Sequence, residues 1–429
     1  MWWFYEVLLV IGLLLYLPKA LWRRRLPHRG WSMRLGRYPR RVTAPLRGHR
    51  PVWIHAVSVG EVLAVRPLLR ALAGCRPREP LVLSTVTPSG FALATTQIDE
   101  RGAAIYFPLD LRACVARSLA AIHPQALLLV ESELWPTMIR LARARGIPIA
   151  LVNGRISPRA FRRYQWVAPW LAGVLGRVDL FLMQSQADAD RIVQLGAPTK
   201  RVRVAGSLKW DASLGARPDA QAISEAARRL GLNGHEVVIV AASTHRGEEA
   251  AALSAFRALR ADHPRARLII APRHLERLAE VDGLIREAHL AAARFSQPPS
   301  NVEWDVGVVD TFGQLPLYYG LATVAFIGGS LIPHGGQNPL EATSMGKPVI
   351  FGPFMHNFAE IAWQLTAHRA ARQLADGAEL TETLRELLAH PAEAEAMGRR
   401  AQELTERSRG TTQRIVAMLQ PLLGADHRG

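Results

Sequence analysis

Residues suited to holding a phosphate and a ribose are concentrated in one segment, FIGGSLIPHGGQNPLEATSMGKPVIFGP, at positions 326–353. An apolar run ends at a glycine pair, a second glycine pair follows, and Asn338, Pro339 and Glu341 come next. A glycine turn that leads into a helix presents free backbone N–H groups to a phosphate. Pro339 suits the first helical turn, and Glu341 lies early enough to accept hydrogen bonds from a ribose. The segment predicts a nucleotide-sugar site, and the alternative is a purely structural glycine turn.

A second segment, WIHAVSVGE, places a carboxylate where it could act as a general base. Glu61 follows an apolar run and Gly60 at the predicted start of a helix. From there the carboxylate would face the carboxyl edge of a parallel sheet and could take a proton from an attacking hydroxyl. The alternative is a glutamate that merely stabilises the helix dipole, and the local pattern favours neither role.

Three more apolar runs in the first half of the chain end in polar residues. VESELWP places Glu131 at the end of a buried strand, with Glu133 close behind as a possible helix cap. NGRIS begins at Asn153 and ends the next run, and AGSLKWD brings Lys209 after the last one. Lys209 could reach an interdomain cleft, although a solvated lysine is the commoner case.

In the second half, four successive apolar runs end in polar or glycine-rich turns. These turns are AASTHRGEE at 241–249, APRH at 271–274, DTFGQL at 310–315 and the glycine pair after Ile327. The hydroxyl, imidazole and glycine donors of the first turn suit a phosphate, and Arg273 could pair with one through two hydrogen bonds. Because the carboxyl ends of parallel strands meet at one edge of a sheet, we expect these turns to converge on a ligand.

Other catalytic signatures are absent from the sequence, which has no GxGxxG, P-loop or HExxH motif. Asp188 and Asp190 have metal-binding DxD spacing, but they follow Ser185 at a predicted helix start, where capping is the simpler role. Cys75 and Cys114 have neither metal-ligand nor redox spacing and indicate a reducing compartment. We therefore expect no metal ion, cofactor or disulfide.

The elements that must position these residues alternate between strand and helix, which predicts two doubly wound α/β domains. A length of 429 residues suits two domains of about 200 residues each. The predicted strands are Val52–Val57, Leu81–Thr85, Ala103–Phe107, Ala126–Val130, Ile149–Val152 and Leu180–Met183, then Val237–Ala241, Leu268–Ile270, Val306–Val309, Thr323–Ile327 and Val349–Phe351. The predicted domains are a membrane anchor at 1–22, a basic segment at 23–50, a first Rossmann-like domain at 51–211, a linker at 212–232, and a second Rossmann-like domain with a C-terminal helix at 233–423.

The first 22 residues are the one membrane-like segment of the sequence. As a helix they would reach roughly 33 Å, enough for a hydrocarbon core of ~30 Å. Trp2, Trp3 and Trp22 suit the two aromatic belts of a bilayer. A signal peptide is disfavoured, because no positive region precedes the apolar run and no small-residue cleavage site follows it. The alternative is a monotopic helix that lies in the interface.

The net charge of +17, from 53 Lys and Arg against 36 Asp and Glu, is placed unevenly. Eleven Lys or Arg lie between Lys19 and Arg50, and no acidic residue occurs between Glu6 and Glu61. By the positive-inside rule this basic block and the rest of the chain should be cytoplasmic. Anionic lipid or an anionic lipid substrate explains the block better than nucleic acid does, because no nucleic-acid-binding motif is present.

Together these motifs strongly resemble those of the 3-deoxy-D-manno-octulosonic acid (Kdo) transferases, the inner-membrane glycosyltransferases of lipopolysaccharide synthesis. The matching segments, in the expected order over nearly the whole chain, are HAVSVGE, STVTPSG, VESELWP, NGRIS, AGSLKWD, AASTHRGEE, APRH, DTFGQL and GGSLIPHGGQNPLEA. HAVSVGE combined with GGS…GGQNPLEA is highly specific, whereas a glycine turn before a glutamate helix would fit any GT-B glycosyltransferase.

The resemblance implies a GT-B fold, in which an acceptor domain and a donor domain face each other across a cleft, preceded here by the membrane-anchor helix. It implies metal-independent, inverting transfer of Kdo from CMP-Kdo to a lipid A precursor (lipid IVA) on the cytoplasmic side of the inner membrane. Glu61 matches the family's general base, and Glu131 and Lys209 match positions that support the transition state. The residues that match its CMP-binding segments are Pro272, Arg273, Phe312, Gly313, Gln314, Asn338, Pro339, Leu340 and Glu341.

Two alternatives to this function remain open. A GT-B enzyme could use a UDP-sugar to make another envelope glycolipid, and a comparison of UDP-sugars with CMP-Kdo as donors would distinguish the two. A non-catalytic, membrane-tethered binding module would need no base, and the carboxylate of Glu61 directly after Gly60 favours an enzyme.

Overall fold

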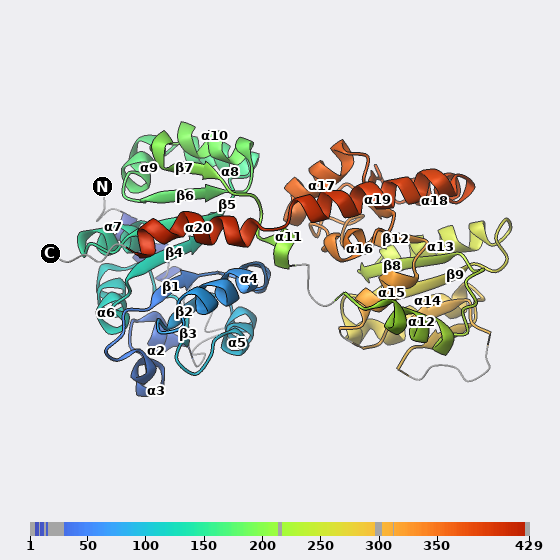
Figure 1. Ribbon diagram of the computed structural model, residues 1–429, viewed down its shortest axis with the longest axis horizontal. Coiled ribbons are helices and arrows are strands. Elements are labelled where there is room, and N and C mark those ends of the chain that lie inside the picture. The colour runs from blue at the N-terminus through green and yellow to red at the C-terminus, as the bar shows by residue number, and fades with distance from the viewer. Residues whose placement is uncertain are drawn as a thin grey trace. The chain divides into compact units, whose positions relative to one another are not determined.

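The computed structural model describes residues 5–7, 9–12, 14–15, 30–212, 217–296, 303–311 and 313–424. The chain divides into two compact units (Figure 1). Unit 1 comprises Met1–Ala212 and Gly410–Gly429, and unit 2 comprises Ser213–Arg409. Each unit is built on its own parallel sheet, so the chain has the two Rossmann-like domains that the strand pattern predicts.

The sheet of unit 1 has seven parallel strands in the order β3-β2-β1-β4-β5-β6-β7. The strands are β1 (Val52–His55), β2 (Leu81–Thr85), β3 (Ala103–Tyr106), β4 (Ala126–Val130), β5 (Ile149–Gly154), β6 (Leu180–Met183) and β7 (Val202–Val204). The four strands β1, β2, β4 and β5 are buried along their whole length, as a parallel sheet that is covered on both faces requires.

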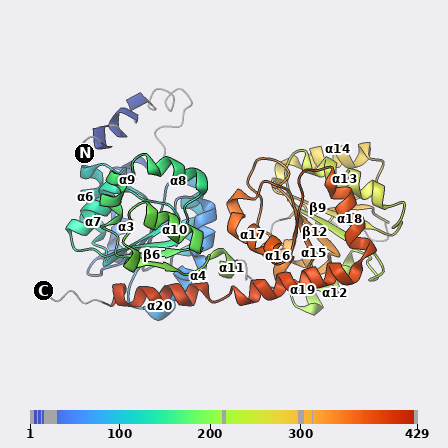
Figure 2. The same ribbon diagram turned by 90° about the horizontal axis from the view of Figure 1, so that it is seen from above.

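Helices cover both faces of this sheet (Figures 1 and 2). In β4, Leu127 and Leu129 enter one hydrophobic cluster, while Ala126, Leu128 and Val130 enter the other, as the two-residue period of a strand dictates. The helices of unit 1 are α2 (Trp31–Arg34), α3 (Arg40–Thr43), η1 (Ala44–Leu46), α4 (Val59–Cys75), α5 (Pro88–Gln97), α6 (Arg112–Ile122), α7 (Pro136–Ala144), α8 (Pro158–Gln165), α9 (Ala168–Leu175), α10 (Gln186–Gln194), η2 (Thr199–Arg201), α11 (Lys209–Ala212) and α20 (Thr411–Leu423).

The last of these helices, α20, lies alongside α4 (Figures 1 and 2). Its apolar residues enter the core of unit 1: Ile415, Val416, Leu419 and Leu423. The carboxylate of Asp211 accepts hydrogen bonds from the backbone N–H groups of Gly410 (3.0 Å) and Thr412 (2.6 Å) and so holds the start of α20. The prediction that the C-terminal helix belongs to the second domain is wrong for α20, because its apolar face packs in the core of unit 1.

The sheet of unit 2 also has seven parallel strands, in the order β10-β11-β9-β8-β12-β13-β14. The strands are β8 (Val238–Thr244), β9 (Arg267–Pro272), β10 (Ala292–Arg294), β11 (Val306–Val308), β12 (Val324–Ile327), β13 (Val349–Phe351) and β14 (Arg372–Gln373). The helices are α12 (Ala220–Arg229), α13 (Glu248–Leu259), η3 (Leu275–Arg277), α14 (Leu278–Glu287), α15 (Leu315–Leu321), α16 (Leu340–Ser344), η4 (His356–Phe358), α17 (Ala359–Ala367), α18 (Glu379–Ala389) and α19 (Pro391–Arg407).

Helix α12 falls within the predicted linker at 212–232, yet it belongs to unit 2. It packs against α15, where a side chain at Gly320 would collide with Ile223. Just beyond α12, the carbonyl of Leu230 accepts a buried hydrogen bond of 2.9 Å from the indole N–H of Trp304. The alanine-rich composition of this stretch therefore reflects a packed helix.

The predicted membrane anchor at 1–22 is described only in part. Residues 5–7, 9–12 and 14–15 are helical, whereas the remainder, and positions 23–29 of the basic segment, lie outside the described residues. Within the described part of the chain, no helix combines the length and apolar character needed to cross a bilayer. The hydroxyl of Tyr5 donates to Asp110 Oδ2 at 3.0 Å, and Glu6 pairs with Arg140 at 3.3 Å, so the described part of this segment contacts the α/β core of unit 1.

Candidate active site

Glu61 lies in the first turn of α4, directly after the loop that follows β1. Its Oε2 accepts a hydrogen bond from the backbone N–H of Val57 at 2.8 Å, and its Oε1 accepts one from the hydroxyl of Ser58 at 3.1 Å. Ser58 in turn accepts the backbone N–H of Glu61 at 3.4 Å, which is close to a reciprocal capping box. These contacts fix the carboxylate in place at the carboxyl edge of the sheet, so helix capping and a chemical role are compatible.

Three carboxylates gather at this edge, because β1 and β4 are neighbours in the sheet. Burial, followed by the negative charges of Glu131 and Glu133, raises the pKa of Glu61 to about 7, against the opposing effect of the hydrogen bonds from Val57 and Ser58. Burial and the charge of Glu131 likewise raise the pKa of Glu133 to about 7. A carboxyl group that titrates near neutral pH is suited to general base catalysis.

Glu131 directly follows β4 and has a positive φ of 58°. Its backbone N–H donates to the carbonyl of Val152 at 3.0 Å, and its Oε1 lies 3.4 Å from Nζ of Lys209. Residues without glycine's freedom seldom adopt this conformation, and such strain concentrates at functional sites. The structure thus brings together Glu61, Glu131 and Lys209, the three residues singled out in the first half of the sequence.

Asn153, which begins the NGRIS motif, supports the loop that carries Lys209. Its Oδ1 accepts the backbone N–H of Leu208 at 2.9 Å, and its carbonyl accepts a hydrogen bond of 2.9 Å from the side chain of Gln184. The side chain of Asn153 is completely buried. Asn153 therefore has a structural role, in which it positions Leu208 and Gln184.

His55, in the HAVSVGE motif, also has a structural environment. Its ring stacks on Phe107 with centroids 3.7 Å apart, and its Nδ1 lies 3.0 Å from the hydroxyl of Ser84. Complete burial lowers the pKa of His55 to about 3, so the ring is neutral at physiological pH.

The DxD pair also serves the local structure. The backbone N–H of Asp188 donates to the hydroxyl of Ser185 at 3.1 Å, and Asp188 Oδ1 accepts the backbone N–H of Ile156 at 2.8 Å. Across the described ranges, no group of three or more His, Cys, Asp or Glu side chains is arranged to hold a metal ion.

In unit 2 the predicted nucleotide-binding residues follow β9, β11 and β12, which are parallel strands of one sheet. Pro272 is the last residue of β9, and Arg273 follows it with an exposed side chain. Gly313 has a positive φ of 84°, and Gln314 precedes α15, where its Oε1 accepts a hydrogen bond of 3.0 Å from the hydroxyl of Tyr318. Phe312 lies outside the described residues.

The segment from Asn338 to Glu341 forms the start of α16, a helix of only five residues. The helix begins at Leu340, so Pro339 precedes it instead of lying within its first turn. Asn338 Oδ1 accepts the backbone N–H of Leu340 at 3.1 Å, while the side chain of Leu340 is fully buried in the core. Burial raises the pKa of Glu341, against a hydrogen bond from Asn338.

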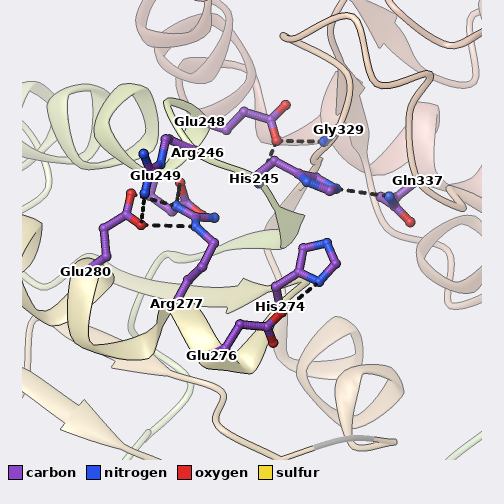
Figure 3. A network of polar contacts seen from close by, with 10 residues as sticks. All are labelled: His245, Arg246, Glu248, Glu249, His274, Glu276, Arg277, Glu280, Gly329 and Gln337. Atoms are coloured by element: carbon purple, nitrogen blue, oxygen red, sulfur yellow. Dashed lines mark hydrogen bonds and ion pairs between the residues drawn. The ribbon is translucent and has the colours of Figure 1, made fainter. Parts of the chain in front are cut away.

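The glycine turn after β12 is held by Glu248, a buried residue at the start of α13 that sequence reasoning missed (Figure 3). Its Oε2 accepts the backbone N–H groups of His245 (2.9 Å) and Gly329 (2.6 Å). Its Oε1 accepts those of Ser330 and Leu331, both at 2.9 Å. One carboxylate therefore fastens the ends of β8 and β12 together, and the acidic pair in RGEE was the available signal.

Three histidines meet beside this turn. The ring of His245 lies 4.1 Å from that of His334 and 5.5 Å from that of His274, between centroids. Burial, followed by the charges of the neighbouring histidines and arginines, lowers the pKa of His245 to about 4. The sequence indicated a phosphate site near His245, but it did not show that His334, which lies 89 positions further on, would join it.

Solved structures define the class of this fold. A glycosyltransferase of Rickettsia africae superposes with a TM-score of 0.61 at 11% identity, over 88% of this chain and 99% of that one. UDP-GlcNAc 2-epimerase of Neisseria meningitidis, bound to UDP-GlcNAc, gives a TM-score of 0.59 at 15% identity. The match covers 86% of this chain and 100% of that one. The two parallel-sheet domains therefore match the fold of GT-B glycosyltransferases.

Sequence comparison then gives the family. Residues 29–212 match the model described as 3-deoxy-D-manno-octulosonic-acid transferase (kdotransferase). The 3-deoxy-D-manno-octulosonic acid transferase of Bordetella pertussis is 37% identical over 424 residues, which are 94% of this chain and 95% of that protein. The Haemophilus influenzae enzyme of the same name is 32% identical over 421 residues, which are 97% of this chain and 95% of that protein. The chain belongs to the Kdo transferase family and is a glycosyltransferase.

Proposed function

We propose that this Kdo transferase takes the sugar from CMP-Kdo and passes it, with inversion at the anomeric carbon, to the lipid A precursor lipid IVA. The observation that carries the catalytic part of the proposal is the group of Glu61, Glu131, Glu133 and Lys209 at one edge of the unit 1 sheet. Within it, Glu61 is the carboxylate anchored by two hydrogen bonds and titrating near pH 7.

In the proposed reaction, Glu61 accepts the proton of the acceptor hydroxyl as that oxygen forms its bond to the anomeric carbon. The bond between the anomeric carbon and the phosphate oxygen breaks on the opposite side, and its electron pair leaves with CMP. Lys209, held by Glu131 at 3.4 Å, supplies a positive charge near the base. Arg273 and backbone N–H groups in unit 2 offset the charge on the leaving phosphate, so the reaction needs no metal ion.

This proposal assigns the acceptor to unit 1 and the CMP-sugar to unit 2. Support for the second assignment comes from Arg273, Gln314 and Glu341, which follow three parallel strands of one sheet. Arg273 can hold the phosphate through two hydrogen bonds, and the carboxylate of Glu341 can accept from the ribose.

Residues 1–22 are proposed to anchor the protein in the inner membrane, with the basic segment at 23–50 against anionic lipid on the cytoplasmic side. Large apolar side chains in the described part of this segment support the anchor: Val7, Val10, Ile11, Leu14 and Leu15 are between 39% and 76% exposed. Apolar surface of this kind favours a hydrocarbon environment.

The test is a product assay with the purified full-length protein in detergent. Incubation with CMP-Kdo and a tetraacyl lipid A precursor should give products whose mass increases by whole Kdo residues, measured by mass spectrometry. Parallel reactions with UDP-sugars should give no product. Transfer from a UDP-sugar without transfer from CMP-Kdo would establish the alternative, a GT-B enzyme that makes another glycolipid.

A further inference from the structure

Three imidazoles and one arginine converge at the carboxyl edge of the unit 2 sheet. His245 follows β8, while Arg273 and His274 follow β9, the neighbouring strand on one side. His334 lies in the loop after β12, the neighbouring strand on the other side. Because the three strands are parallel and adjacent, their ends deliver these side chains to one place.

Hydrogen bonds from its surroundings hold His245 in place (Figure 3). Only 7% of the residue is exposed, its backbone N–H is bound by Glu248, and its Nε2 lies 3.2 Å from the side-chain nitrogen of Gln337. The side chain of His274 is 48% exposed, and His334 is exposed. His245 is therefore the buried member of the group, whereas His274 and His334 are accessible to solvent.

Positive charge exceeds negative charge around the ring of His245. Glu248 directs both of its oxygens to backbone N–H groups. Arg277 is paired with Glu249 at 2.7 Å and with Glu280 at 3.1 Å, as Figure 3 shows. For Arg273, no carboxylate among the described residues forms an ion pair with its side chain. His274 lies 3.5 Å from Glu276, a side chain that is 78% exposed.

We propose that His245, His274 and His334 form, with Arg273, the site for the phosphate of the sugar nucleotide, and that this cluster takes up a proton when the phosphate binds. The inference rests on the proposed CMP-sugar donor. Without a ligand, burial and four positively charged or ionisable neighbours (His334, His274, Arg273 and Arg277) keep His245 neutral, with its pKa near 4. An anion within about 4–6 Å reverses this balance, because it favours the protonated ring.

Proton uptake would serve the reaction itself. The phosphate carries one negative charge in the phosphodiester of the donor and gains a second when its bond to the sugar breaks. A proton already held in the cluster offsets that second charge at the oxygen where it develops. The proton returns to solvent when CMP dissociates and the cluster loses its anion.

The experiment is a calorimetric titration of CMP into the full-length protein at pH 7.5, in HEPES and in Tris, whose ionisation enthalpies differ. The difference in apparent enthalpy measures the protons exchanged per CMP bound. At this pH we expect the wild type to take up a measurable fraction of one proton, because a single imidazole changes its charge and a nearby anion raises its pKa by only about 1–3 units. Cytidine, which lacks the phosphate, should cause no uptake.

Two variants locate the proton. His245→Gln should still bind CMP but with little or no uptake. His274→Gln, at a half-exposed side chain where folding is not at risk, should weaken CMP binding by roughly tenfold, as expected for a lost hydrogen bond to a charged group. His263→Gln is the matched control: this histidine precedes β9, at the opposite end of the same sheet, and its removal should change neither quantity.

The outcomes separate this inference from the function on which it rests. Failure of CMP to bind the wild type would overturn both the proposed donor and the histidine site. Tight binding of CMP without proton uptake, or uptake that persists in His245→Gln, would overturn the inference alone. If His274→Gln bound CMP as tightly as the wild type, His274 would not contact the phosphate, and the proposed three-histidine site would be wrong.

Discussion

Nζ of Lys209 lies 3.4 Å from Oε1 of Glu131, so an ion pair joins the first residue of α11 to the residue that follows β4. The pair places a positive charge against one of the carboxylates that gather near Glu61. Glu131 itself has a positive φ of 58°, a backbone conformation that non-glycine residues seldom adopt. Preorganised charge of this kind is what a transition state requires, because no reorganisation is left for the moment of reaction.

Replacing Glu61 with glutamine should reduce turnover by roughly 10²–10⁴-fold, the usual contribution of a general base. The amide oxygen can still accept one of the two hydrogen bonds from Val57 and Ser58, so the fold and the CMP affinity should be retained. Initial rates with CMP-Kdo and lipid IVA provide the measurement. Glu100→Gln, at an exposed position of the same unit, is the control. Near-normal turnover of Glu61→Gln would exclude its role as the base.

The pH profile of kcat/KM should lose activity below about pH 7, because a base must be deprotonated and the pKa of Glu61 is raised to about 7. Glu133→Gln removes one of the negative charges that raise this pKa. The acidic limb of the profile should therefore move to lower pH, by a fraction of a unit, in that variant. A limb centred near pH 4.5, the ordinary value for glutamate, would show that another environment governs the base.

The nucleotide site should respond to changes in unit 2 and not to changes at Glu61. Arg273→Ala removes a charge-assisted hydrogen bond of about 1.5–3 kcal/mol, which corresponds to a loss of CMP affinity of roughly 10–100-fold. Glu341→Ala should also lower the affinity for CMP, because it removes the carboxylate that accepts a hydrogen bond from the ribose. Calorimetry on both variants and on Glu61→Gln makes the comparison, with Arg257→Ala, at an exposed position of α13, as the arginine control. If Glu61→Gln and Arg273→Ala lowered the affinity for CMP equally, the assignment of acceptor and donor to different units would be contradicted.

Arg277, four residues beyond Arg273, should matter for stability. Its partner Glu249 has a fully buried side chain, so Arg277→Ala leaves an uncompensated charge and should destabilise unit 2 by about 3–5 kcal/mol. The double variant Arg277→Met with Glu249→Leu removes both charges and should recover much of this loss. Urea unfolding of the three proteins gives the free energies. A single variant as stable as the wild type would contradict the prediction that the charge of Glu249 is left uncompensated.

Deletion of residues 1–22 tests the proposed anchor. The truncated protein should leave the membrane fraction, and its activity on detergent-dispersed acceptor should largely survive. Release only at raised salt would indicate that the basic segment provides a second, screenable attachment. Retention in membranes at high salt would contradict a single anchor. Tyr5→Phe is a useful control, because it removes only the hydrogen bond to Asp110 and should leave membrane attachment intact.

The strands that sequence reasoning missed share a physical cause. β7, β10 and β14 lie at or next to the edges of their sheets, are two or three residues long, and have largely exposed or half-exposed side chains. They lack the continuous apolar runs that identified central strands such as β4. Pattern alone cannot distinguish such edges from loops.

The candidate site was predictable where a single residue follows a single strand. Glu61, Glu131 and Arg273 each occupy such a position, and the structure places them at carboxyl edges. Glu248 and His334 were not predictable, because their roles depend on contacts 81 to 89 positions away along the chain. The same limit applies to α20: an amphipathic pattern shows that a helix has a buried face but not which core receives it.

The placement of α20 sets an order for folding during synthesis. Unit 2 ends at Arg409, so every residue of its core is available before α20 is translated. Unit 1 begins first, yet the hydrophobic cluster that α4 forms on its sheet stays incomplete until Ile415 and Leu419 have left the ribosome. The domain that starts first must therefore finish last, and the apolar surface left open for α20 is the one that a chaperone would meet during that interval.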